Sequence, residues 1–80
     1  MMPATGELAS PSLTSRQLLV AMFYGDGLTA GEIALVLGTS TSTIRTHIKH
    51  ARGKYRDIGR DATTRLALRE RLLEDGYLHG

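Results

Sequence analysis

Residues 28–48 read LTAGEIALVLGTSTSTIRTHI, and this stretch contains two helix starts separated by a tight turn. Thr29 is placed to accept a hydrogen bond from the first helical turn, and Glu32 stands three residues later to complete a capping box. Gly38 supplies the left-handed backbone that ends a helix, and Ser40 is a good N-cap for the next one. The stretch therefore predicts a short helix, a turn and a second helix.

The small and apolar residues of the same stretch predict how the two helices cross. Ala34 lies four positions before Gly38, where two closely packed helices leave room for only a small side chain. The expected shared core consists of apolar residues from both helices: Ile33, Leu37, Ile44 and Ile48. This arrangement is typical of a helix-turn-helix, whose second helix enters the major groove of DNA.

Similar signals on both sides of this stretch predict two more helices. Thr14 and Gln17 form another capping box, and the run 25–27 (Gly-Asp-Gly) ends the helix that they start. The helix after Ser40 is expected to run to about residue 56. A fourth is expected from about Thr63 to Glu74, with Asp61 or Thr63 as its cap.

No segment alternates with a period of two, so no sheet is expected. The predicted fold is an all-α, four-helix domain over residues 13–78, like a winged helix without the wing. Residues 1–12 are small, polar and contain proline, so they are expected to form a flexible tail.

Composition argues against several classes of protein. A chain of 80 residues allows one small domain, and the absence of Cys excludes disulfides and thiolate metal sites. No apolar run is long enough for a membrane span and no secretory signal is recognisable, so a cytoplasmic protein is expected. The three histidines are too few and too scattered for a metal site. With no paired carboxylates and no phosphate-binding glycine loop, we expect neither an enzyme nor a cofactor.

Positive charge is concentrated in the third predicted helix. Residues 45–56 contain five Lys or Arg residues and no acidic residue. Four of them recur at helical spacing beside an apolar stripe: Arg45, Lys49, Arg52 and Arg56. A charged stripe is most often only a solvated face, but next to the Ala34–Gly38 spacing it favours DNA binding. The exposed face is expected to carry hydrogen-bond donors suited to phosphates and bases: Ser42, Arg45, Thr46, Lys49 and Arg52.

Taken together, residues 13–78 resemble the LuxR/GerE-type helix-turn-helix family. The matching segments are Leu13-Thr14 with Gln17, then 27–29, 32–34, 37–40 and 43–48, the Lys54 position, and the ending 76–78. The resemblance implies that the third helix enters the major groove and that Arg45, Thr46 and Lys49 face bases. It also implies phosphate contacts by a further set of residues: Thr29, Ser42, Thr43, His47 and Lys54.

Members of this family often dimerise through the fourth helix. Here that helix offers one strip of Leu66, Leu73 and Tyr77 for a second copy, and Leu68 with Leu72 for the core. Its arginines alternate with acidic residues and are expected to form crossed ion pairs between two copies: Arg65, Arg69 and Arg71. The sequence departs from the family in residues 54–62, where the link between the last two helices is longer than usual.

The functional prediction is a sequence-specific DNA-binding transcriptional regulator that binds double-stranded DNA as a homodimer, which can form on the DNA itself. Residues 47–56 also resemble region 4 of sigma factors, a related helix-turn-helix that reads promoter elements. The alternative is therefore a protein-interaction module that docks on RNA polymerase or on a sigma factor.

Overall fold

A computed structural model describes residues 10–79 and contains four helices within them, which confirms the predicted all-α fold. They are α1 (Ser15–Gly25), α2 (Ala30–Leu37), α3 (Thr41–Asp57) and α4 (Arg65–Glu74). None of the helices in this described part is long and apolar enough to cross a membrane. Of the expected flexible tail, residues 1–9 lie outside the described residues, and residues 10–12 belong to no helix.

The predicted caps determine where the first three helices begin. Thr14 and Gln17 exchange two hydrogen bonds of 3.1 Å at the start of α1, and Thr29 and Glu32 exchange bonds of 3.1 and 2.8 Å at the start of α2. Gly38 ends α2 in the left-handed conformation with φ of 66°. The turn therefore lies where the sequence places it.

The start of α4 differs from the prediction. Its N-cap is Thr64, whose hydroxyl accepts a hydrogen bond of 3.0 Å from the backbone N–H of Ala67, so the helix begins at Arg65. Asp61 and Thr63 do not cap the helix. Instead, the Asp61 carboxylate accepts hydrogen bonds from the backbone N–H and the hydroxyl of Thr63 and closes a small turn before the helix.

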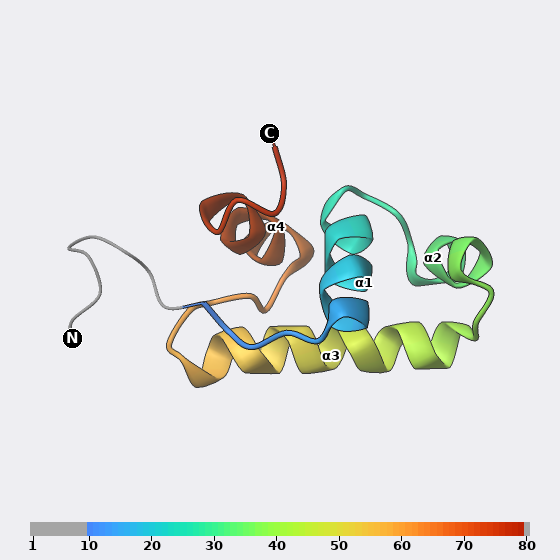
Figure 1. Ribbon diagram of the computed structural model, residues 1–80, viewed down its shortest axis with the longest axis horizontal. Coiled ribbons are helices and arrows are strands. Elements are labelled where there is room, and N and C mark those ends of the chain that lie inside the picture. The colour runs from blue at the N-terminus through green and yellow to red at the C-terminus, as the bar shows by residue number, and fades with distance from the viewer. Residues whose placement is uncertain (1–9, 80) are drawn as a thin grey trace.

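Helix α1 lies across the middle of α3 and divides the core into two clusters (Figure 1). Val20 packs into a cluster with residues of α2 and of the first half of α3: Ile33, Ala34, Ile44 and Ile48. The next residue, Ala21, packs into a second cluster with the end of α3, the loop and α4: Ala51, Tyr55, Ala62, Leu68, Leu72 and Leu78. The apolar stripe of α3 is therefore buried along its whole length.

Helix α3 runs without a break through Gly53. A glycine inside a helix costs about 1 kcal/mol relative to alanine, but it does not interrupt this helix. A Cβ at this position would meet only the Arg56 side chain, at 3.4 Å. The helix that is predicted to contact DNA is thus one continuous helix of 17 residues.

Candidate nucleic-acid interface

The outer face of α3 presents the three residues predicted to face bases. Arg45, Thr46 and Lys49 are exposed, whereas Ile44 and Ile48 on the opposite face are fully or almost fully buried. Within residues 10–79, Arg45 and Lys49 form no salt bridge and no side-chain hydrogen bond. Two cations and a hydroxyl are therefore available on one face of a rigid helix.

Hydroxyl groups surround the turn that leads into α3. Thr29, Ser42 and Thr43 are exposed, and Thr43 accepts a hydrogen bond of 2.9 Å from the Ser40 hydroxyl. The Thr46 hydroxyl donates to the carbonyl of Ser42 at 3.1 Å. These groups lie at the N-terminal ends of α2 and α3, where backbone N–H groups and the helix dipole favour anions.

Two of the predicted contact residues on α3 lie away from the turn. His47 is half-buried. Lys54 lies on the flank away from Arg45 and Arg52, and its ammonium donates bonds of 2.7 Å to the carbonyl of Ser12 and to the side-chain carbonyl of Gln17. A phosphate contact by Lys54 would have to compete with these two bonds, which tie the start of α1 to α3.

Arg52 is held in place by an aromatic residue that the sequence did not reveal. Its guanidinium donates a hydrogen bond of 3.1 Å to the hydroxyl of Tyr24 and lies 5.3 Å from the centre of the Tyr24 ring. Arg65 of α4 lies over the same ring at 4.5 Å and donates to the carbonyls of Gly27 and Leu28. Tyr24 therefore gathers two cations from separate helices.

A groove of about 660 Å³ runs beside the basic stripe of α3. The α3 wall extends from Arg45 through Lys49 and Arg52 to Arg56. Residues 59–63 of the loop form the other wall, while Tyr24 contributes from α1. The contribution of Arg56 and of the loop was missed by sequence reasoning. The periodicity of the stripe places Arg56 next to Arg52, but nothing local indicates that the loop folds back alongside them.

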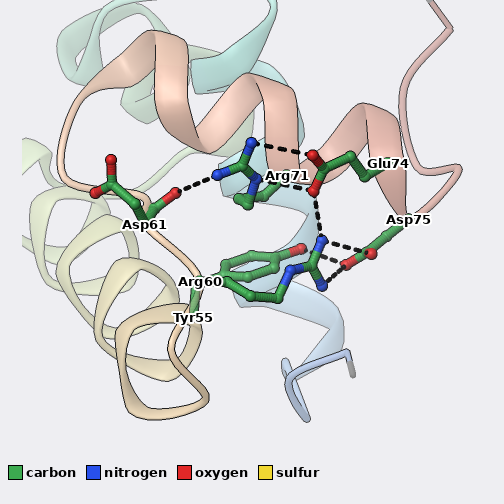
Figure 2. Close-up of polar contacts among 6 residues, drawn as sticks. All are labelled: Tyr55, Arg60, Asp61, Arg71, Glu74 and Asp75. Carbon is green, nitrogen blue, oxygen red and sulfur yellow. Dashed lines mark hydrogen bonds and ion pairs between the residues drawn. The ribbon is translucent and has the colours of Figure 1, made fainter. Parts of the chain in front are cut away.

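An ion-pair network holds this loop in position (Figure 2). Arg60 forms salt bridges of 2.9 Å with both Glu74 and Asp75, and the side chains of Arg60 and Asp75 are only 9% and 4% exposed. Burial alone would lower the pKa of Arg60, but hydrogen bonds to Asp75 and Glu74 outweigh it and the pKa is raised. Arg71 of α4 pairs with Glu74 and donates to the carbonyl of Asp61. The adjacent loop residues 60 and 61 are therefore both held by contacts with α4 and its C-terminal end.

The face of α4 predicted to bind a second copy is partly available. Leu66 is 65% exposed, whereas Leu73 and Tyr77 are half-buried against the second core cluster. Leu68 and Leu72 are fully buried, as expected for core positions.

The arginines of α4 are engaged within the chain rather than free for crossed ion pairs, which corrects that expectation. Arg65 binds the carbonyls of Gly27 and Leu28, while Arg69 binds the Gly25 carbonyl and Asp26 at the end of α1. These contacts complete the end of α1, where the last carbonyls have no helical partner.

Comparison with known proteins supports a role in transcription. No curated protein and no solved structure matches the chain. The family model for sigma-70, region 4, matches residues 14–54, which include α1, α2 and most of α3 and make up just over half of the 80 residues. Together with the four-helix architecture, the match supports a helix-turn-helix DNA-binding domain. The chain belongs to the sigma-70, region 4, family.

Proposed function

We propose that this protein is a sequence-specific DNA-binding transcriptional regulator whose α3 helix reads the major groove. The observation that carries the proposal is that Arg45 and Lys49 lie exposed beside Thr46 on the outer face of α3, with no ion-pair partner within residues 10–79. Recognition of this kind is an equilibrium and needs neither a cofactor nor catalysis. We place the protein in the cytoplasm with double-stranded DNA as its ligand.

The proposed contacts follow from the chemistry of each group. A guanidinium such as that of Arg45 forms two parallel hydrogen bonds to O6 and N7 of guanine, which are worth about 1–3 kcal/mol of discrimination. Lys49 and Thr46 lie one turn or less away and extend the base-facing surface. Thr29, Ser42 and Thr43 are placed for phosphates, which fix the register of the helix without carrying sequence information.

The test starts with selection of bound sequences from random duplex DNA, followed by measurement of Arg45→Ala on the selected and on a scrambled duplex. We expect the preference for the selected duplex to fall about tenfold or more, because base contacts contribute chiefly to specific binding. Arg16→Ala, which removes an arginine that is likewise exposed on α1, is the charge-matched control. An equal loss on both duplexes would reduce Arg45 to a phosphate contact.

We further propose that this helix-turn-helix domain is of the LuxR/GerE type, in which two copies pair through α4 on the DNA. The exposed Leu66 supports this, since about two-thirds of this leucine is left uncovered by the described residues. A two-fold dimer would read two half-sites about one helical turn apart, which compensates for the few base pairs that one helix can read.

A second candidate function is docking on RNA polymerase, as the sigma-70, region 4, match suggests. It is favoured by the outer face of α2, where Leu35 is 85% and Val36 is 60% exposed. The test is the double variant Leu35→Ser with Val36→Ser. If α2 is a polymerase contact, binding of purified RNA polymerase is lost while DNA affinity stays unchanged. Retention of polymerase binding by this variant counts against the candidate.

A further inference from the structure

Because α3 is long, its basic residues cannot all contact the same part of a DNA duplex. At a rise of 1.5 Å per residue, Arg45 and Arg56 are about 16 Å apart along the helix axis. The major groove is only about 12 Å wide, and the N-terminal residues of a recognition helix are those that contact base edges. If Arg45 faces bases, Arg52 and Arg56 lie at the edge of the groove, where the sugar-phosphate strand runs.

The groove beside Arg52 and Arg56 is built in advance of binding. Arg52 is fixed by the Tyr24 hydroxyl, and Arg65 stacks on the same ring from the other helix, so two guanidinium groups converge on one aromatic side chain. The far wall is formed by loop residues 59–63. That wall is anchored to α4 through the buried pair of Arg60 and Asp75.

Positive charge in the groove is only partly balanced by acidic residues. Glu74 and Asp75 are committed to Arg60 and Arg71, and Asp26 is committed to Arg69. Within the described residues, Arg56 pairs only with Asp57, at 3.5 Å between side chains that are more than two-thirds exposed. Such pairs contribute little. Lys49 has no ion-pair partner in the described part of the chain.

One acidic residue opposes this charge. Asp61 lines the groove on the loop side, and the hydrogen bonds from the Thr63 hydroxyl and N–H lower the pKa of its carboxyl group. The carboxylate therefore stays ionised at neutral pH and repels any anion that enters the groove.

We propose that this groove holds the sugar-phosphate backbone of one strand of the duplex, with Arg56 and Arg52 as phosphate ligands and Asp61 as an opposing charge. The inference rests on the proposed function, because it requires that α3 lies in the major groove. It adds a second contact surface to the helix: the wall of α3 and the loop that follows it, rather than the outer face alone.

The experiment measures how the dissociation constant depends on salt for the selected duplex and for a scrambled one. In Arg56→Gln, the slope of log K against log salt should fall by about one, equally on both duplexes, because one phosphate contact is lost. In Asp61→Asn, both duplexes should bind more tightly at low salt. The asparagine carbonyl can still accept from Thr63, so this change removes the charge and keeps the turn.

Two variants outside the groove match these changes in charge. Arg16→Gln removes an exposed arginine on α1, and Glu70→Gln removes an exposed carboxylate on α4; neither residue lines the groove. Both control variants should change the salt slope and the affinity much less than Arg56→Gln and Asp61→Asn do.

The outcomes separate this inference from the proposed function. If the unaltered protein shows no preference for any duplex sequence, the proposed function fails and the groove proposal fails with it. If it binds selectively but Arg56→Gln and Asp61→Asn behave like their controls, only the groove proposal is overturned. A loss confined to the selected duplex in Arg56→Gln also overturns it, since that result would make Arg56 a base contact.

Discussion

The phenol of Tyr55 in α3 donates a 2.8 Å hydrogen bond to the carboxylate of Asp75 at the end of α4. Tyr55 is completely buried, and burial, followed by the bond to Asp75, raises the pKa of its hydroxyl above the usual value. The phenol therefore remains a donor throughout the neutral range. The bond joins the C-terminal part of α3 to the end of α4 (Figure 2).

Removing this hydrogen bond should destabilise the fold. Tyr55→Phe is expected to lower the free energy of unfolding by about 1.5–3 kcal/mol, because the lost bond is to a charged acceptor. Asp75→Ala should cost more, about 3–5 kcal/mol, since it removes the buried one of the two carboxylates that pair with Arg60. Urea unfolding followed by circular dichroism measures both. Equal stability of Tyr55→Phe and the unaltered protein would contradict this account of the α3–α4 contact.

The turn of the helix-turn-helix gives a second prediction. Gly38 has φ of 66° and no atom within 4 Å of the position that a Cβ would occupy. Gly38→Val should therefore cost about 1–2 kcal/mol through backbone strain alone. Ala34→Leu should cost about 1–3 kcal/mol by a different mechanism, overpacking at the crossing of α2 and α3, where Ala34 is buried. Thermal unfolding measures both effects, and DNA affinity should fall with them.

Gly31 serves as the control for the turn because it lies inside α2 with ordinary helical backbone. A Cβ there would meet only the Thr29 hydroxyl, at 3.9 Å, so Gly31→Ala should stabilise the protein by about 0.5–1 kcal/mol. Unchanged melting of both Gly38→Val and Ala34→Leu would mean that the turn is not as described.

Stability should decrease in acid in a way that can be traced to Glu74. The hydrogen bond from Arg60 lowers the pKa of this carboxyl group below its ordinary value. Its contribution to stability is therefore fully present above the unfolded pKa of about 4.3 and is lost as pH falls through the lower folded pKa. Glu74→Gln should be less stable than the unaltered protein at pH 7, and the difference between the two should shrink as the pH falls through the folded pKa.

Urea unfolding at pH 7, 5 and 3 measures this difference. Glu70→Gln, an exposed change on the same helix that breaks no ion pair, should show no comparable gap at any pH. A gap between Glu74→Gln and the unaltered protein that persists unchanged at pH 3 would show that the charge of Glu74 is not the cause.

The proposed dimer is best tested at Leu66. Because this side chain is mostly exposed, Leu66→Glu should leave the fold intact, whereas Leu73→Glu would also disturb the core. We expect Leu66→Glu to abolish cooperative binding to a duplex with two half-sites and to leave binding to a single half-site nearly unchanged. Leu35→Glu, an even more exposed leucine on α2, is the control. Should the folded Leu66→Glu variant still bind cooperatively, α4 is not the interface and the loop 57–62 becomes the next candidate.

Local signals predicted most of the helix-turn-helix from sequence. The capping boxes at Thr14 and Thr29, and the left-handed Gly38, each depend on residues within a few positions of one another, and all are present. The predicted start of α4 was wrong because three nearby residues, Asp61, Thr63 and Thr64, are all of types that cap helices well. The choice among them follows from how the loop is held by α4 rather than from propensity.

Long-range polar contacts were beyond the reach of pattern reasoning. Arg52 and Tyr24 are 28 residues apart, Lys54 and Gln17 are 37 apart, and Arg69 and Gly25 are 44 apart. No periodicity relates such pairs, because they meet only after the helices have packed. For the same reason, the groove beside α3 could not be predicted from the sequence. The basic stripe of α3, which forms one of its walls, was predicted.

The divided core has a consequence for how such a chain can diverge. Val20 and Ala21 of α1 support separate halves of α3, so Ile44 and Ile48 depend on α2, while Ala51 and Tyr55 depend on the loop and α4. Substitutions in the C-terminal third of the chain therefore change the packing at the C-terminal end of α3. They leave the packing beneath the first turns of α3 intact. A lineage can therefore vary α4 and its partners over generations while the packing beneath the first turns of α3, where we propose base contacts, persists.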